Sequence, residues 1–343
     1  MLRLFLLTLI LTLNLRITSA YWTPCSCSRD SPLIPGASVI IGGFDMTELA
    51  TSDDRSFKSP IFDYSGKYSC LKPGSQAICY IVPAELNILN TDISKTLQVE
   101  DLFDTYYDHV EVFSESYTCS VGIGVPDFSM SVNYHYELLT SSELLQSGFS
   151  NMGYAYYAEY LYSLNMPPAY TLKLNFIFGT ALNALPSTIE SIDDQNMYNE
   201  FLLAYGGYYI STLIMGGGFH MNQYVDQSYI SSYSFTETIE EMQAGFNAQI
   251  FNMNFGYWSN SSEYTQSDSY TESSTESLTC YGGDISLECG SNEWKMTITK
   301  FPSSLNATVI PIYYLVKDNQ QKYITLKGEI DSYTKCGCLP SSS

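Results

Sequence analysis

Two segments of the chain carry apolar patterns that fit both a helix and a strand, and this double periodicity restricts the possible folds most. In residues 119–165 a helical face is formed by Leu145, Phe149, Met152, Tyr156 and Tyr160. Several of the same side chains also alternate, as in a strand: Met152, Tyr154, Tyr156, Tyr160 and Tyr162. A segment with both patterns can bury its apolar residues as a helix in one state and as a strand in another.

The second such segment covers residues 222–279. Its helical face comprises Ile239, Met242, Phe246, Ile250 and Met253, whereas Phe251, Met253, Phe255 and Tyr257 alternate with polar residues. Its last part, residues 259–279, is acidic and rich in Ser and Thr, which also fits a solvated linker.

A glycine-bounded apolar stretch, YGGYYISTLIMGGG at residues 205–218, separates the two segments. Ser187 and Glu190 have the spacing of a capping box, and the apolar spacing after them predicts a helix that ends at Gly206-Gly207. The following run, YYISTLIM, predicts a buried strand that ends at the triplet Gly216 to Gly218.

The first twenty residues have the features of a cleaved secretory signal. Arg3 precedes an apolar run from Leu4 to Leu15, and small residues follow at Thr18-Ser19-Ala20. The run is shorter than the roughly 20 residues that a membrane-spanning helix needs. We therefore expect residues 1–20 to be removed and the mature protein to be secreted and extracellular, with storage in secretory granules as a further possibility.

The strongly acidic composition limits the possible partners. The formal net charge is −21, and it becomes more negative once a signal carrying two arginines is removed. Nucleic acid and anionic bilayers repel such a protein, so no nucleic-acid partner is expected. Any membrane must be contacted through a receptor, a divalent cation bridge or uncharged lipid.

Nine cysteines in an exported chain predict a disulfide framework with one cysteine left over. Cys70 with Cys79, and Cys280 with Cys289, could each close a hairpin-sized loop. Cys25 and Cys27 could then join Cys336 and Cys338, which leaves Cys119 unpaired. Metal binding by the two CxC pairs is the alternative, but no histidine lies near either pair, so no metal is expected. The spacing does not fix the connectivity.

Signatures of catalysis are missing from the sequence. No GK[ST] follows the glycine triplet, and Pro126 stands where a dinucleotide loop after Gly122 and Gly124 would begin its helix. HExxH and GxSxG do not occur, and the three histidines, His109, His135 and His220, are far apart in the sequence. We expect neither an enzyme nor a cofactor.

The order and spacing of these features resemble the membrane attack complex/perforin (MACPF) family. Tyr205, Gly206 and Tyr209, followed by six residues and Gly216-Gly217, match the spacing of its signature, although Gly207 and Tyr208 replace its usual hydroxyl residue and histidine. Gly282-Gly283, Trp294 and Pro302 before VIPIYYLV are similar to its closing pattern. The resemblance extends over residues 21–343 as a single domain.

The resemblance implies an α+β fold with a strongly bent, antiparallel four-stranded sheet, as in this family and the cholesterol-dependent cytolysins. Two helical clusters, at about 119–165 and 222–279, would flank the sheet and unwind into β-hairpins. Gly216, Gly217 and Gly218 would lie where the sheet bends, since glycine puts no side chain into a bend.

The implied function is that of a secreted, perforin-like pore-forming protein, in immunity or as a toxin. It would bind target membrane lipid or a membrane receptor, form a homo-oligomer there and insert its hairpins. The membrane-inserting candidates are Val121, Ile123, Phe128, Met130, Val132, Phe251, Met253 and Phe255.

The alternative is a non-lytic MACPF protein that acts in binding, development or matrix association. The scarcity of apolar side chains in the C-terminal half of residues 222–279 favours it, as does the expectation that no membrane-recruiting domain follows. A tyrosine-rich glycan-binding module is a third possibility. Asn260 and Asn306 begin the glycosylation sequons.

Overall fold

One long strand, β11 (Tyr208–Asp226), is the spine of the main sheet. It has antiparallel neighbours along both edges. β2 (Gly42–Phe44) and then β9 (Phe149–Asn165) occupy one edge, and β13 (Ser303–Pro311) and then β12 (Ser274–Tyr281) occupy the other. The computed structural model describes residues 22–45, 57–73, 78–98, 128–130, 149–252 and 266–337.

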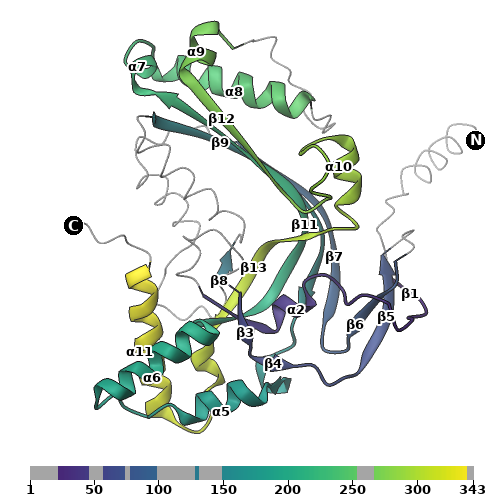
Figure 1. The fold of residues 1–343 in the computed structure, drawn as a ribbon, viewed down its shortest axis with the longest axis vertical. Coiled ribbons are helices and arrows are strands. Elements are labelled where there is room, and N and C mark those ends of the chain that lie inside the picture. The colour runs from purple at the N-terminus through teal and green to yellow at the C-terminus, as the bar shows by residue number, and fades with distance from the viewer. Residues whose placement is uncertain are drawn as a thin grey trace, which may run out of the picture.

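Three further strands extend this sheet outward. β7 (Asn87–Gln98) pairs with the outer edge of β9, β3 (Phe57–Pro60) pairs with β2, and β8 (Phe128–Met130) pairs with β13, all antiparallel. The neighbours β7, β9, β11 and β12 therefore lie in that order. Figure 1 shows these long strands curving between a helical end of the molecule and an opposite end that also carries helices.

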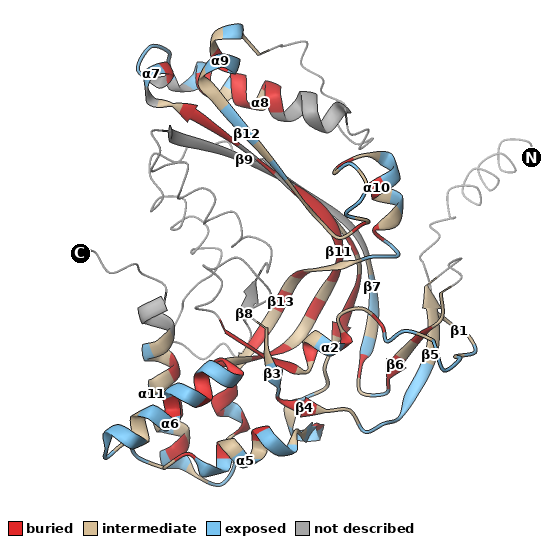
Figure 2. Cartoon of the chain, in the orientation of Figure 1, coloured by how far each residue is buried: buried red, intermediate tan, exposed pale blue. Residues whose placement is uncertain are grey.

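The first helical end is formed by α5 (Phe176–Ala184), α6 (Ile192–Tyr205) and α11 (Gln320–Gly337). The buried face of α6 consists of Tyr198, Phe201, Leu202 and Tyr205, the spacing that one side of a helix presents. Leu326 and Ile330 of α11 pack into the same core, and Figure 2 shows the buried positions of these helices. The short elements here are β4 (Phe62–Asp63), β10 (Lys173–Leu174), η3 (Ala169–Thr171) and η4 (Ile312–Leu315).

Polar contacts of Lys322 and Tyr333 tie α11 to the rest of this end. Lys322 is buried, and its Nζ donates hydrogen bonds to the carbonyls of Leu182 and Asn183 at the C-terminus of α5. Asp45 is fully buried after β2, where it accepts a hydrogen bond from Tyr333 Oη (2.9 Å) and lies 3.4 Å from Lys58 Nζ. Because buried charges need such partners, these contacts help to fix the position of α11.

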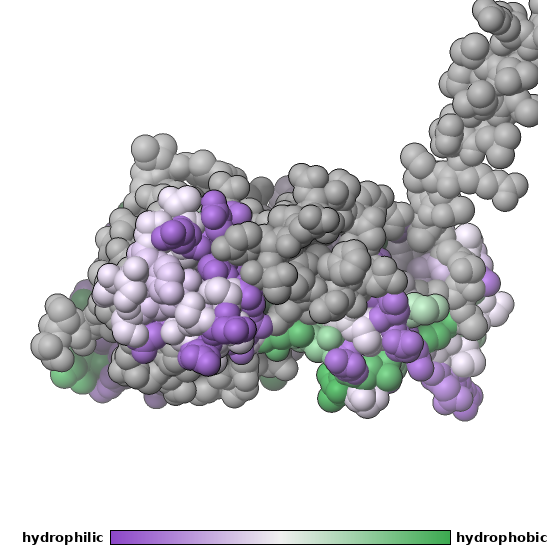
Figure 3. Space-filling model, turned by 90° about the horizontal axis from the view of Figure 1, so that it is seen from above, coloured by the Kyte–Doolittle hydropathy of each residue, from purple (hydrophilic) through white to green (hydrophobic). Residues whose placement is uncertain are grey.

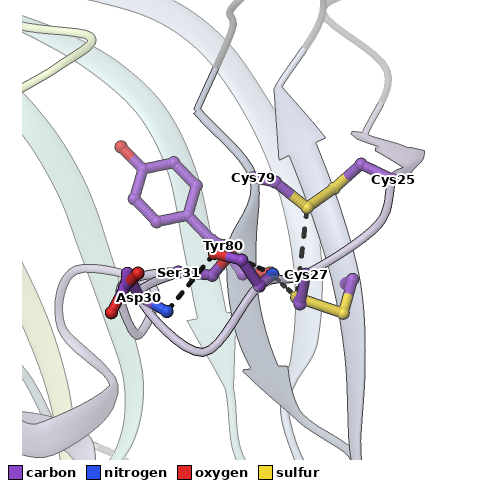
Figure 4. The surroundings of a disulfide bond; sticks show 8 residues. Cys25, Cys27, Asp30, Ser31, Cys79 and Tyr80 are labelled. Carbon is purple, nitrogen blue, oxygen red and sulfur yellow. Dashed lines mark hydrogen bonds between the residues drawn. A yellow bond between two sulfur atoms is a disulfide. The ribbon is translucent and has the colours of Figure 1, made fainter.

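A small sheet of β1 (Trp22–Pro24), β5 (Tyr68–Pro73) and β6 (Tyr80–Pro83) is fastened by two disulfides, Cys25–Cys79 and Cys27–Cys70. The two disulfides lie close together, with Cys27 Sγ of one and Cys79 Sγ of the other 4.0 Å apart (Figure 4). The expected Cys70–Cys79 pair is therefore wrong, because β1 pairs with β5 and brings Cys25 and Cys27 to these cysteines. The short helix α2 (Ala37–Ile40) follows.

The cysteines near the C-terminus therefore do not reach Cys25 and Cys27, contrary to the expected link between the termini. Cys336 belongs to α11, and Cys338 and Cys119 lie outside the described residues. The pair Cys280–Cys289 does form, as its spacing indicated.

Two expected boundaries are corrected by the strands. The sequence predicted a strand that ends at the glycine triplet, whereas β11 continues through the triplet to Asp226. Residues 149–165 form strand β9 throughout, so the first helical cluster, placed at 119–165, cannot include them. Of residues 119–148, only β8 is described.

In the second predicted cluster, 222–279, the described residues include three helices between β11 and β12. They are α7 (Gln227–Ile230), α8 (Phe235–Asn252) and α9 (Asp268–Ser273), and they form the far end of the molecule in Figure 1. The two ends of the predicted range belong to β11 and β12. We call residues 227–273 the second segment.

Candidate functional site along the central strand

The entry into β11 is fixed by the C-terminus of α6. Tyr205, the last residue of α6, is buried, and its ring packs against those of Phe178 and Phe201 at centroid distances of 5.1 and 5.2 Å. Gly206 then takes a positive φ of 68°, and its N–H donates to the carbonyl of Leu202 (2.7 Å). A Cβ at Gly206 would also lie 2.3 Å from the carbonyl oxygen of Phe44, so only glycine fits.

Tyr209 packs the first residues of β11 against the core of the helical end. Its buried ring meets Phe62 edge-on at 5.3 Å, and its backbone pairs with Gly43 of β2 and Ile310 of β13. The signature residues Tyr205, Gly206 and Tyr209 therefore act as a structural anchor for the central strand.

The glycine triplet lies where β11 changes its neighbour on one edge. Pairing with β13 reaches Gly216, opposite Ser303, and pairing with β12 begins at Gly218, opposite Tyr281. On the other edge, the register with β9 shifts between Met215 and Gly216. We call residues 216–218 the partner exchange, because here the central strand leaves one neighbour and takes up another.

Close contacts explain why this exchange needs three glycines. A Cβ on Gly216 would lie 2.0 Å from the carbonyl oxygen of Glu159, and a Cβ on Gly218 would lie 2.3 Å from that of Tyr157. At Gly217 the obstacle is instead a side chain, since its Cβ would come within 2.6–2.9 Å of Ile298. Gly216 and Gly218 therefore allow the backbone of β9 to approach closely, and Gly217 leaves room for the side chain of Ile298.

Ile298 belongs to a compact lobe, residues 282–301, that covers the exchange and contains α10 (Asn292–Thr297). The lobe begins at Gly282 and Gly283, which have φ values of 69° and 73°, and the Nε1–H of buried Trp294 donates to the carbonyl of Gly282 at 2.9 Å. Cys280–Cys289 joins the lobe to β12. The resemblance in sequence had pointed to Gly282, Gly283 and Trp294. In the structure these residues belong to the lobe that lies against the glycine triplet.

The second segment packs on the C-terminal half of β11, and aromatic side chains form much of the core between them. Phe219, Met221 and Val225 of β11 are buried together with Tyr229, Met242 and Tyr270 from α7, α8 and α9, in that order. The ring of Tyr270 meets that of Tyr229 edge-on at 5.4 Å. Viewed from this end, the described outer surface over these helices is mainly hydrophilic (Figure 3).

A buried polar network interrupts this core. Gln223 is 1% exposed and lies opposite Glu276 in the β11–β12 register, and its Nε2 donates to Glu276 Oε1 at 2.6 Å. Tyr270 Oη donates to Gln223 Oε1 at 3.0 Å. Burial, the nearby carboxylates Glu276 and Glu241, and Tyr229 raise the pKa of Tyr270, so its phenol remains a proton donor.

Of the membrane-inserting candidates, three fall on described backbone. Phe128 and Met130 lie in β8 opposite Val309 and Ala307 of β13, and Phe251 lies near the end of α8. The remaining candidates lie outside the described residues: Val121, Ile123, Val132, Met253 and Phe255. Among the three described candidates, Phe128 and Met130 share β8, whereas Phe251 belongs to α8, which lies apart from β8 in Figure 1.

The sequons occupy different situations. Asn306 lies within β13, half-buried and opposite Ile214 of β11, a setting unlike the exposed loops in which glycans are usually attached. Asn260 lies outside the described residues.

Several contributors to the site were not found from sequence. Ile298 and the carbonyls of Tyr157 and Glu159 have no local signal, because only the tertiary fold brings them to the glycines. Gln223 did have one: it occupies a buried-face position in the alternation Phe219, Met221, Gln223, Val225. A polar side chain at a core position usually has a buried partner.

Two other kinds of site have no candidate within the described part of the chain. No helix there is both long and apolar enough to cross a membrane. No group of three or more His, Cys, Asp and Glu side chains in those residues has an arrangement that could hold a metal ion.

These features define a class of α+β proteins in which long antiparallel strands continue into a helical segment and return from it. The family model for the MAC/Perforin domain matches residues 34–343. The chain therefore belongs to the MACPF family.

Solved structures support the same fold. GNIP1Aa from Chromobacterium piscinae aligns with a TM-score of 0.60 and 20% identity, over 90% of this chain and 57% of its own. A MAC/Perforin-domain protein of Bacteroides thetaiotaomicron aligns with a TM-score of 0.51 and 12% identity, over 92% of this chain and 64% of its own. The chain thus spans about three fifths of each of these proteins. No curated protein matches.

Proposed function

We propose that this chain is a secreted, perforin-like pore-forming protein that assembles as a homo-oligomer on a target membrane and inserts two β-hairpins. MACPF proteins are pore formers or binding proteins rather than enzymes, and we place this chain among the pore formers. The observation that carries the proposal is the position of the second segment between two strands that already pair with each other.

The paired strands provide a template for a hairpin. β11 and β12 pair antiparallel, and Val225 opposite Ser274 is the last pair before the second segment. The second segment connects the end of β11 to the beginning of β12. If α7, α8 and α9 unwind, both strands can extend without any change of register. A membrane-spanning strand needs about 9–11 residues, so residues 227–273 are more than sufficient for two strands and a turn.

The same connection recurs on the other side of the sheet. β7 ends at Gln98 and β9 begins at Phe149, and these neighbours are also antiparallel, with Gln98 opposite Ala155. Residues 99–148 therefore replace 119–165 as the first proposed hairpin segment. Strands in hydrocarbon must close into a barrel to satisfy their backbone groups, which is why the proposal includes assembly of several copies.

The alternative is a non-lytic protein that uses the same fold for binding. It is favoured by the few apolar residues in 259–279 and by the use of one of them, Tyr270, in the core described above. A non-lytic protein would keep its second segment helical on a membrane.

Leakage from dye-loaded liposomes tests the proposal directly, with electron microscopy of the same samples to detect rings. Vesicles should include uncharged phosphatidylcholine, with and without sterol, because the chain is strongly acidic. Dye release together with rings supports the pore former. Binding without release or rings, on membranes from the native target, supports the non-lytic alternative.

A further inference from the structure

The buried polar network between the second segment and the sheet has a geometry that an ordinary core would not need. Among the described residues, the buried polar side chains of the molecule include Gln223, Thr238 and Glu241, and all three belong to this region. Gln223 comes from β11, and the other two come from α8. Apolar side chains at these positions could pack the helices onto the sheet without any hydrogen bonds. The presence of polar side chains at buried positions therefore requires an explanation.

Two strands, β11 and β12, and two helices, α8 and α9, contribute to the network. Gln223 of β11 bridges Glu276 of β12 and Tyr270 of α9, at 2.6 and 3.0 Å. On α8, Glu241 Oε2 accepts a hydrogen bond from the backbone N–H of Ser267 (2.9 Å), and its carbonyl accepts one from Gln266 Nε2 (3.1 Å). The hydrogen bonds therefore connect the helices to each other and to the strands.

Close packing of α8 forms the lid of the network. A Cβ on Gly245 would lie 2.2 Å from Gln223 Nε2 and 2.4 Å from Gln266 Nε2. Gln223 cannot move away freely, because the same nitrogen is hydrogen-bonded to Glu276. The absence of a side chain at Gly245 thus allows α8 to close over the network.

We propose that Gln223, Glu276, Tyr270 and Glu241 form a latch that holds the second segment on the sheet and sets how readily it is released. The role of the latch in function rests on the proposed pore formation. Its hydrogen bonds are replaced by water when the segment leaves, so opening costs less than exposing an equal apolar area. In the closed state, however, loss of one partner leaves buried polar atoms unsatisfied.

Hydrogen exchange of the soluble protein tests the latch without a membrane. Tyr270→Phe removes only the hydroxyl and leaves the ring on Tyr229, and we expect amide exchange in α8 and α9 to become about tenfold faster. Tyr233→Phe is the matched control, because Tyr233 is in the same segment but its hydroxyl meets only Ser269, at the surface. Equal exchange in the two variants would overturn the proposal.

A pair of glycine substitutions tests the packing of the lid. Gly245→Ala should also speed exchange in α8 and α9, because the new methyl group displaces Gln223 or Gln266. Gly328→Ala in α11 is its control, since a Cβ there meets nothing within 4 Å and Ala favours the helix. Exchange in α5, α6 and α11 should remain unchanged in Gly245→Ala, and an increase there as well would indicate general destabilisation and contradict the latch.

A third variant keeps the test informative if these two are too mild. Gln223→Glu places a second carboxyl beside Glu276. Three other titratable side chains lie at this site: Glu241 of α8, Tyr270 of α9 and Tyr229 of α7. Two carboxylates at hydrogen-bond distance do not both ionise easily, so the pKa of one must rise. Compared with the wild type at the same pH, exchange in α8 and α9 should be faster at pH 7.5, and the difference should become smaller at pH 5, when the pair shares a proton. No difference from the wild type at pH 7.5 would reject the latch.

Liposome leakage then separates the latch from the proposed function. If both hold, Tyr270→Phe should release dye severalfold faster than the wild type, and Tyr233→Phe should not. Exchange differences in a protein that never releases dye would retain the latch and reject the pore. Dye release by the wild type, with identical exchange in Tyr270→Phe and Tyr233→Phe, would retain the pore and reject the latch.

Discussion

At the scale of single residues, the three glycines of the partner exchange are not equivalent. Gly216 and Gly218 face carbonyl oxygens of β9, which cannot move without breaking the β9–β11 pairing. Gly217 faces the side chain of Ile298, which can be shortened. The middle position can therefore be tested by compensation, and the outer positions cannot.

Gly217→Val should give a folded monomer that is less stable by about 1–3 kcal/mol, the usual effect of overpacking a core. It should also release less dye, because a larger residue restricts movement at the exchange. Ile298→Ala should restore much of the stability of Gly217→Val although it destabilises the wild type. Thermal melts of the four proteins in this double-mutant cycle measure the coupling.

Gly218→Ala provides the contrast, because its methyl group would meet the backbone of Tyr157. We expect misfolding that Ile298→Ala does not correct. Compensation at this position, or additive effects at Gly217, would show that the contacts around the triplet have been assigned wrongly.

Asp194 should make stability depend on pH in the acidic range. Hydrogen bonds from the N–H of Glu190 and from Ser191 hold the pKa of Asp194 below its ordinary value. Its contribution is thus complete above the ordinary Asp pKa of about 3.9 and is lost as the pH falls through the lowered folded value. Asp194→Asn should flatten the acidic side of a plot of melting temperature against pH. An unchanged plot would contradict this role.

At the scale of elements, local signals in the sequence located helix ends better than helix starts. The helix before the glycine pair ends as predicted, at Tyr205 with Gly206 as its cap. It begins four residues later than expected, because Ser191 and Asp194 form the capping box and not Ser187 and Glu190. Ser187 instead accepts hydrogen bonds from Asn319, just before α11, and from Thr325 within α11. These contacts join residues more than a hundred positions apart, so no local pattern could reveal them.

A second difference from the sequence pattern concerns residues 171–178. The run TLKLNFIF suggests a strand, but β10 contains only Lys173 and Leu174, and Asn175 caps α5 by accepting hydrogen bonds from two backbone N–H groups. The double periodicity of the chain did identify the second segment. It could not decide between helix and strand for residues 149–165, because pairing with β7 and β11 decides that.

The first hairpin segment carries the prediction that belongs to this scale. In the proposed membrane state, Met130 faces lipid and Ser131 faces the lumen. A lysine on the lipid face near the bilayer centre costs about 2–4 kcal/mol, so Met130→Lys should abolish dye release while Ser131→Lys is tolerated.

Because Met130 lies in β8 of the present structure, melting temperatures of both variants must accompany the leakage assay. Equal loss of release in two well-folded variants would refute the alternation.

At the scale of the whole molecule, a glycan on the second segment would distinguish the two candidate functions. Asn260 lies in the part of the chain between α8 and α9, which a hairpin would have to carry across the bilayer. A glycan is large and strongly hydrated, and its transfer through hydrocarbon would be prohibitive. We expect Asn260 to be unmodified in a pore-forming protein. Peptide mass spectrometry of protein from its native source measures the occupancy, and full occupancy in a lytic protein would contradict this reasoning.

The strand that organises the sheet also dictates when the protein can fold. β11 lies between residues 42–44 from near the beginning of the chain and residues 303–311 from near its end. Contacts so distant in sequence close slowly, and the last of them cannot form until the ribosome has synthesised more than three hundred residues. Until then, one edge of the apolar stretch that becomes β11 lacks its partner, so chaperones in the compartment of synthesis have a long interval in which to bind it.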